Sequence, residues 1–265
     1  MYQDVKNAYL GDKRTLVPEK YHSSFINLKG AFDAHYLIWK LLCRGGVDKG
    51  KVLIIGVHGG RDYFGLKLKG YDVHGFDLCP DPDFNQLKIG NVEEELPYAD
   101  GEFDAVIMSN IIEHLKFDAT ALTNVRRIIR DKGLLIVAVP FLNDIPEHHI
   151  RVHTRKSCQR LLTNCGYEIL ETVERPGILR LPNWSNQALH LMGWITLKLF
   201  GFLPHTKILP LYAEFEYRIG HIYHPIRRLS RGYCGCFLCR KSDEKSKSYL
   251  EHNVDSFSAR HTDKS

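Results

Sequence analysis

The sequence predicts an α/β fold in which seven mostly parallel strands form one sheet with helices on both faces. Three observations support this prediction. Segments typical of strands and of helices alternate from residue 51 onwards; the strand segments, above all GLLIVAV at 133–139, are continuously apolar; and a glycine-rich turn follows the first of them. Continuously apolar strands are buried on both faces, as in parallel sheets that helices cover on each side.

The composition is that of an ordinary globular protein with a sizeable core. The chain has 265 residues, of which 44% are hydrophobic and 25% are charged. One α/β domain with an accessory segment can therefore bury enough apolar surface to fold without disulfides or metals. The seven cysteines show no paired framework, and the first residues contain no apolar run typical of a secretory signal. We therefore expect a cytoplasmic protein in a reducing compartment.

The elements are expected where the apolar periodicity changes along the chain. Residues 1–28 predict irregular structure, and the apolar spacing that follows predicts a helix over 29–43 that ends at Gly45 and Gly46. Further helices are expected between the glycine turn and residue 68, over 118–130, and from the Thr154 cap to Gly166. Strands bounded by turn residues are expected at 51–55, 71–76, 87–89, 103–108, 133–139, 167–173 and 233–239.

This order divides the chain into three parts. Residues 1–46 form an N-terminal segment and helix that we expect to roof the site, residues 47–241 form the α/β domain, and the polar tail 242–265 is expected to be disordered. Inside the domain, an apolar insertion at 175–231 precedes the last strand. Residues 175–241 contain ten Arg or Lys and two Glu, a net charge of +8 against +5 for the whole chain. This local excess favours an anionic surface or substrate, and no nucleic-acid partner is expected.

The most apolar part of the insertion is NQALHLMGWITLKLF at 186–200, continued by GFL to 203. Because apolar residues occupy nearly the whole circumference of this helix, three interpretations stand: a cap over a substrate pocket, a helix lying on an anionic membrane surface, or a membrane span. A spanning helix needs about 20 predominantly apolar residues. Gly193, Gly201 and Lys198 interrupt this stretch, so the pocket cap is favoured.

A nucleotide site is expected at the turn Gly56–Gly60, which reads GVHGG. Glycines let backbone amides approach a ligand, and the N-terminus of the following helix favours negative charge. Asp77 ends the second strand, 21 residues after Gly56, where its carboxylate can accept both ribose hydroxyls of an adenosine. Dinucleotide enzymes need G-x-G-x-x-G, and here His58 and Arg61 occupy two of the three glycine positions. A nicotinamide-dependent oxidoreductase is therefore the disfavoured alternative.

The same region resembles a known family through four segments in order: VLIIGVHGGRDYFGLKLKGYDVHGFDL, GNVEEELPYADGEFDAVIMSNIIEHL, VRRIIRDKGLLIVAVP and HHIRVHTRKSCQRLLTNCGYEILE. They resemble the motifs of class I S-adenosylmethionine-dependent methyltransferases, in the type 11-like branch that modifies small molecules, lipids or saccharides. The resemblance implies a Rossmann-like fold with S-adenosylmethionine as cofactor. It also implies methyl transfer to a small-molecule, saccharide or lipid-linked acceptor, with a hydroxyl as the expected target and a peripheral place at a membrane in view of the insertion.

The resemblance also implies which residues contact the cofactor. Glycines of the turn would lie against its methionyl part, Asp77 and the residue after it would hold the ribose and adenine, and Asn91 would accept a hydrogen bond from the adenine amino group. Residues after the fourth strand would form the floor under the sulfonium. The expected cofactor-binding residues are Gly56, His58, Gly60, Asp77, Leu78, Asn91, Val92, Asn110 and Ile111.

Two positions depart from the family pattern. Ile54 stands where the first strand usually has an acid, and His58 replaces the usual middle glycine of the turn. The acid normally helps to hold the amino group of the cofactor, and a histidine can crowd the turn or contact the ligand. These departures leave an alternative open: a non-catalytic cofactor-binding or scaffold copy of the methyltransferase fold.

Histidines are the candidates for removing a proton from an acceptor hydroxyl, because their pKa lies near neutrality. His149 is the first candidate, since it matches the recurrent HIR segment of the family; His148 is the second, and His114 in the EHL segment is the third. Each has a structural interpretation as well, in which it anchors its loop. Glu113 is equally open between fixing that loop and a direct role.

The C-x-C-x-x-C pattern near the C-terminus has two interpretations. Cys234, Cys236 and Cys239 could hold zinc, or they could belong to a buried strand. Strand alternation points Cys234 and Cys236 to one face and Cys239 to the other, which suits a single metal poorly. We therefore favour the buried strand and expect no metal there.

Overall fold

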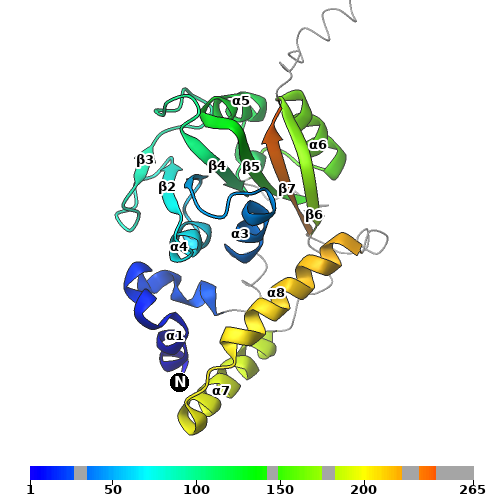
Figure 1. Ribbon diagram of the computed structural model, residues 1–265. Coiled ribbons are helices and arrows are strands. Elements are labelled where there is room, and N and C mark those ends of the chain that lie inside the picture. The colour runs from blue at the N-terminus through cyan, green and yellow to red at the C-terminus, as the bar shows by residue number, and fades with distance from the viewer. Residues whose placement is uncertain (27–34, 142–148, 175–182, 223–232, 243–265) are drawn as a thin grey trace, which may run out of the picture.

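The computed structural model describes residues 1–26, 35–141, 149–174, 183–222 and 233–242 (Figure 1). Its seven strands form one sheet in the order β3-β2-β1-β4-β5-β7-β6, and β7 runs antiparallel to both of its neighbours, β5 and β6. The pairs among β1 to β5 are parallel. The predicted seven-stranded, mostly parallel sheet is therefore confirmed. The strands are β1 (Lys51–Ile55), β2 (Asp72–Asp77), β3 (Leu87–Ile89), β4 (Phe103–Ser109), β5 (Ile129–Phe141), β6 (Tyr167–Glu174) and β7 (Tyr233–Lys241).

Helices cover both faces of the sheet, as alternate residues of β1 show. Val52 and Ile54 point into one apolar cluster, which α3 and α4 cover, whereas Leu53 and Ile55 point into a second cluster beneath α5 and α6. Such two-sided burial is what a parallel sheet requires. The helices are α1 (Tyr2–Leu10), α3 (His35–Arg44), α4 (Arg61–Leu68), α5 (Asp118–Ile128), α6 (Arg155–Asn164), α7 (Asn183–Phe200) and α8 (His205–Ile222).

Local signals fixed several of these boundaries. α6 begins with a capping box in which the Thr154 side chain accepts from the Ser157 backbone N–H at 3.1 Å, and the Ser157 hydroxyl accepts from the Thr154 N–H at 2.8 Å. Gly166, at φ 81°, ends the same helix in the left-handed region that favours glycine. The predicted cap and stop of this helix are confirmed.

The prediction of irregular structure over residues 1–28 is wrong for its described part. Residues 2–10 form α1, and two 3-10 helices follow, η1 (Gly11–Leu16) and η2 (Glu19–Phe25). A nine-residue helix this polar has little stability of its own. It forms because Val5 packs with Ile26, Leu189 and Leu209 in a small apolar cluster between the N-terminal segment and the helices α7 and α8.

The segment between β6 and β7 contains α7 and α8, which project from the sheet as an antiparallel pair (Figure 1). None of the helices in the described parts of the chain is long and apolar enough to cross a membrane. The tail expected to be disordered spans 242–265. Ser242 is instead hydrogen-bonded to Gly166 and Arg126, and residues 243–265 lie outside the described residues.

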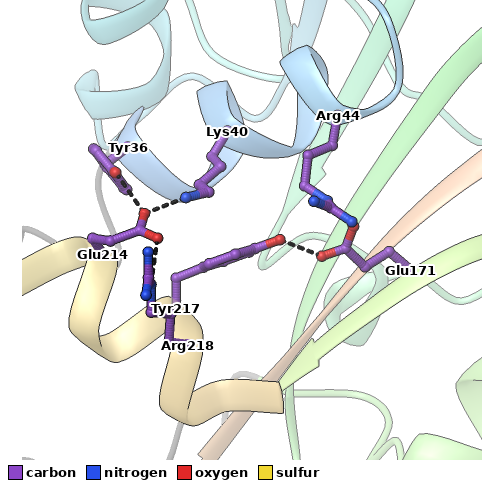
Figure 2. Close-up of polar contacts among 7 residues, drawn as sticks. All are labelled: Tyr36, Lys40, Arg44, Glu171, Glu214, Tyr217 and Arg218. Atoms are coloured by element: carbon purple, nitrogen blue, oxygen red, sulfur yellow. Dashed lines mark hydrogen bonds and ion pairs between the residues drawn. The ribbon is translucent and has the colours of Figure 1, made fainter.

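A cluster of polar side chains fastens α8 to α3 (Figure 2). The Glu214 carboxylate accepts hydrogen bonds from the Tyr36 hydroxyl at 3.0 Å, from the Lys40 ammonium, and from Arg218 Nε at 2.9 Å. Hydrogen bonding from Lys40 and Arg218 lowers the pKa of Glu214 to about 2. The acid is thus ionised throughout the physiological range.

The same cluster extends to the edge strand β6. The Tyr217 hydroxyl donates to Glu171 Oε1 at 2.5 Å, and Arg44 Nε of α3 donates to Glu171 Oε2 at 2.6 Å (Figure 2). Glu171 therefore links α3, α8 and β6, and the projecting helices have a defined attachment to the sheet domain.

Glu214→Gln should lower the free energy of unfolding by about 1 kcal/mol, the upper range for partly exposed ion pairs. Because the pKa of Glu214 is lowered on folding, its contribution is present above the ordinary value of 4.5 and is lost as the pH falls through about 2. Urea denaturation of both proteins between pH 7 and pH 2 should show the difference shrinking in acid. Asp131→Asn, at a 94% exposed side chain, is the control. An equal loss at every pH would contradict the ionic interpretation.

Candidate cofactor and acceptor site

The predicted cofactor residues meet at one edge of the sheet, where the parallel strands end. Gly56 follows β1, Asp77 is the last residue of β2, Asn91 comes shortly after β3, and Asn110 follows β4. The register places Ile55 of β1 beside Phe76 and Met108, so these strands finish at the same level. In open α/β sheets, this carboxyl edge is where ligands bind.

The turn after β1 has a backbone that only glycine adopts freely. Gly56 has φ 79° and Gly60 has φ 62°, both in the left-handed region. Space is equally restrictive, because a Cβ at Gly56 would overlap Ile111, and one at Gly60 would lie 2.6 Å from the ring of Tyr21. Two glycines are thus needed for the turn itself, and Ile111 lies against it as expected of the pocket floor.

Asp77 is held ready as an acceptor at the end of β2. One carboxylate oxygen accepts from the Val57 N–H at 2.8 Å and the other from the Cys79 N–H at 3.3 Å. These contacts join the carboxylate to the glycine turn, while each oxygen keeps a lone pair for a further donor. The neighbouring Leu78 is 68% exposed and offers an apolar surface. Both features fit the ribose and adenine of the expected cofactor.

The remaining predicted contacts have different surroundings. The Asn91 side-chain oxygen accepts from the Glu93 N–H at 3.0 Å, which leaves it one lone pair for an amino group. Val92 is buried. Asn110 is exposed and has φ 55°, a left-handed conformation that asparagine tolerates better than most residues. The turn residue His58 is also exposed, so it does not compete for space in the core.

Ile54 is one of the two departures from the family pattern, and its burial accounts for an apolar side chain there. Its side chain is 2% exposed and belongs to the apolar cluster that includes Val52, Val57 and Tyr63. A carboxylate at this position would need a partner to offset the loss of hydration. An apolar residue therefore stands where the family pattern predicted an acid, and Asp77 supplies the carboxylate beside the glycine turn.

Tyr21 is a residue of this region that sequence reasoning missed. Its ring lies over Gly60 and packs against Phe64 and Phe84, with ring centroids 5.2 Å and 6.0 Å away. Its hydroxyl donates to Asp81 at 3.5 Å. The N-terminal segment thus covers the glycine turn. No motif marks Tyr21, because it lies far from the turn along the chain and only the packing of η2 brings it there.

The candidate histidines form a group on the same edge of the sheet. The rings of His114 and His149 are perpendicular, with centroids 4.8 Å apart, although they come from the loops after β4 and β5. Glu113 lies beside them, and its Oε1 is 3.9 Å from His114 Nε2. The structure therefore brings together two of the three histidines. His148 lies outside the described residues.

Glu113 is the most unusual ionisable group of the site. It is 1% exposed, and neither carboxylate oxygen has a hydrogen-bond partner among the described residues. Burial raises the pKa of this carboxyl group to about 7, against smaller opposing effects of its own backbone N–H and of His114. Displaced pKa values of this kind are concentrated at functional sites.

Two other features lie apart from this site. A groove of about 1180 Å³ between α5 and α6 is lined by Gly101, Arg130 and Lys241, which mark the opposite edge of the sheet. Cys236 and Cys239 are buried in the two different apolar clusters, which confirms the predicted alternation along β7. Burial raises the pKa of both thiols, so thiolate ligation there is disfavoured.

Comparison with known proteins finds methyltransferases among those that resemble this chain. Residues 53–137 match the family described as a methyltransferase domain. A curated protein, the ubiquinone biosynthesis O-methyltransferase of Dechloromonas aromatica, is 25% identical over 115 residues, which cover 38% of this chain and 47% of the relative. The chain thus spans about half the length of that relative.

Solved structures share the fold. The 1,6-didemethyltoxoflavin-N1-methyltransferase of Burkholderia thailandensis, crystallised with its substrate and S-adenosylhomocysteine, has a TM-score of 0.51 at 16% identity, over 80% of both chains. An S-adenosylmethionine-dependent methyltransferase of Archaeoglobus fulgidus has a TM-score of 0.51 at 15% identity, over 78% of this chain and 95% of its own. The predicted resemblance to methyltransferases is therefore confirmed over residues 53–137, and the solved structures confirm the predicted fold.

Asp77→Ala should weaken binding of S-adenosylhomocysteine by ~2 kcal/mol or more, because a charged acceptor for the ribose is lost. Calorimetry of the full chain measures this change. Asp72→Ala, at the exposed start of the same strand, is the matched control and should bind as the wild type does. Equal affinity for Asp77→Ala and wild type would show that the cofactor lies elsewhere.

Proposed function

We propose that this chain transfers a methyl group from S-adenosylmethionine to a hydroxyl group of a small-molecule, saccharide or lipid-linked acceptor. The observation that carries the proposal is the contact between the glycine turn and Asp77, inside the segment that matches the methyltransferase domain. The O-methyltransferase among its relatives supports oxygen as the acceptor atom.

The residues of the site suit a direct displacement. The cofactor supplies the methyl group on its sulfonium. Asp77 would hold the ribose, the turn Gly56–Gly60 would support the methionyl part, and Leu78 with Asn91 and Val92 would receive the adenine. Asn110 and Ile111 would form the floor of the reacting centre. The main contribution of the protein is alignment of acceptor and methyl group, which is worth ~7–11 kcal/mol in well-oriented systems.

An acceptor hydroxyl must lose its proton as the methyl group arrives, and the histidine group is placed to control that step. His149 remains our first choice, with His148 second and His114 third. The support is positional: His149 follows β5 and His114 follows β4, so both lie at the edge where the cofactor residues meet. An imidazole near neutral pKa suits proton transfer.

A second candidate function is a cofactor-binding scaffold without turnover. Ile54 favours it, because this apolar residue stands where the family pattern has an acid and its side chain is buried in an apolar cluster. The two functions differ in one measurement. A methyltransferase converts S-adenosylmethionine to S-adenosylhomocysteine in proportion to acceptor, whereas a scaffold binds both and consumes neither.

His149→Ala should lower turnover by ~10²-fold or more while affinity for S-adenosylhomocysteine is kept, since proton transfer contributes on that scale. The assay follows tritium from the labelled methyl group into fractionated small-molecule and lipid extracts, over a range of pH. His74→Ala, on β2 and outside the group, is the control. Turnover within a few-fold of the wild type would make His149 structural, and no labelled product from the wild type would favour the scaffold.

We also propose that the chain works at an anionic membrane surface, which would bring it to a lipid-linked acceptor. The support is an apolar stripe on α7. Trp184, Leu191, Ile195 and Leu199 are spaced by seven or four residues, so they lie along one face of the helix, and each is 40% to 68% exposed. An exposed apolar stripe of this extent is unusual on a soluble surface.

The second helix adds a stripe that mixes apolar and basic side chains. Lys207, Leu211, Phe215 and Arg218 follow one another at helical spacing, and all are exposed. The two helices contain two acidic residues, Glu214 and Glu216, and Glu214 binds Lys40 of α3. The exposed stripe Lys207, Leu211, Phe215 and Arg218 is itself apolar and cationic, which suits an anionic lipid surface better than a neutral one.

The double change Leu211→Ser with Phe215→Ser should reduce co-sedimentation with phosphatidylserine vesicles by about 10-fold or more, because two apolar side chains no longer enter the interface. High salt should weaken wild-type binding, by roughly 1 kcal/mol for each basic residue engaged. Leu170→Ser, an exposed position on β6, is the control. No wild-type binding at low salt would exclude this surface, and self-association in the ultracentrifuge that the double change abolishes would identify a second copy as the occupant.

A further inference from the structure

Glu113, His114 and His149 form a compact set of potential metal ligands that the proposed function leaves unexplained as a set. One nitrogen of each imidazole and one oxygen of the carboxylate all lie within 4.8 Å of one another. Glu113 and His114 lie on the short 3-10 helix η3 (Ile112–His114) after β4, and His149 lies in the loop after the neighbouring strand β5. The three side chains thus converge from two separate segments of the chain.

The Glu113 carboxylate gives an independent indication that a partner belongs here. It is 1% exposed, and both of its oxygens are buried without a hydrogen-bond partner among the described residues. Buried polar groups are almost always satisfied, and an exception often marks the place of an ion or a water molecule. The imidazole nitrogen Nε2 of His114 lies 3.9 Å from Oε1.

Hydrogen bonds hold the segment after β4 and the segment after β5 against each other. The Glu113 carbonyl accepts from the N–H groups of Ile150 and Arg151, at 3.0 and 3.1 Å. Arg151 also donates to the carbonyls of Leu115 and Lys116, at 3.3 and 2.5 Å. Four hydrogen bonds thus tie the residues after His149 to the segment that carries Glu113 and His114. The three side chains are arranged before any ligand arrives.

We propose that Glu113, His114 and His149 bind one divalent transition-metal ion. Two imidazole nitrogens and one carboxylate oxygen are a donor set for ions such as zinc, iron, cobalt or manganese, whereas magnesium and calcium prefer oxygen alone. Three protein ligands leave coordination positions open, as in catalytic rather than structural metal sites. The ion would also neutralise the Glu113 carboxylate, whose oxygens otherwise have no hydrogen-bond partner among the described residues.

The consequence for methyl transfer rests on the proposed function. An acceptor hydroxyl that fills an open position has a lowered pKa, so it loses its proton to solvent water more readily. The oxygen then forms the new bond to the methyl carbon, and the sulfur keeps the electron pair of the bond that breaks. In this case, the loss of turnover expected for His149→Ala would result from loss of the bound ion.

Metal binding can be measured without the acceptor. The full chain, freed of metal with a chelator, is titrated with Zn²⁺ by calorimetry and with Co²⁺ by visible absorption. We expect one ion per chain, and Glu113→Gln and His149→Ala should each weaken binding by at least about 10-fold, the smallest effect usual for losing a group that supports a metal. His74→Ala should bind as the wild type does.

Three results would overturn the proposal: no stoichiometric ion in the wild type, unchanged affinity in the double variant Glu113→Gln with His149→Ala, or a thiolate charge-transfer band showing that Co²⁺ sits on cysteine. Binding of S-adenosylhomocysteine by the same variants shows that they are folded. It also separates the two proposals, because a chain that binds the cofactor and transfers methyl groups without metal retains its proposed function and loses only this site.

Discussion

The burial of β1 between two neighbours and two helical layers is the constraint on which the site depends. Its side chains alternate between the two apolar clusters, and its backbone is paired with β2 on one side and β4 on the other. With no freedom left in this strand, the chain must turn sharply at Gly56, and the ends of β2 and β4 are brought to the same level. The contacts of Asp77 and Ile111 with the turn follow from that register.

Two parts of the chain outside the sheet pack against the sheet domain at different places. The N-terminal segment places Tyr21 over Gly60, while α7 and α8 are attached through Glu214 and Glu171 to α3 and β6. The N-terminal helix α1 packs with α7, so the cover of the turn and the projecting helices share the small apolar cluster around Val5. A ligand that displaces one of these parts therefore also affects the other.

Much of the sheet and of the cofactor edge could be predicted, because the signals are local. The Thr154 cap, the glycine turn and the acid that ends the second strand each depend on a few adjacent residues, and the structure has them where the sequence places them. Contacts between distant segments could not be predicted in this way. Helix α1 forms through burial of Val5, Tyr21 reaches the turn through η2, and His114 meets His149 because Arg151 joins their loops. Residue patterns and spacing along the chain do not show which distant segments pack together.

The position of β7 has a consequence for how the chain reaches this structure during synthesis. β7 is synthesised after the other six described strands, yet it lies between β5 and β6, and β6 is held in the sheet through its pairing with β7. Until residue 241 has emerged, β5 has one exposed edge and β6 has no strand beside it among the described residues. Unpaired strand edges are templates for pairing with other chains. The growing chain therefore passes through a stage at which the edges of β5 and β6 that β7 later covers are both unpaired.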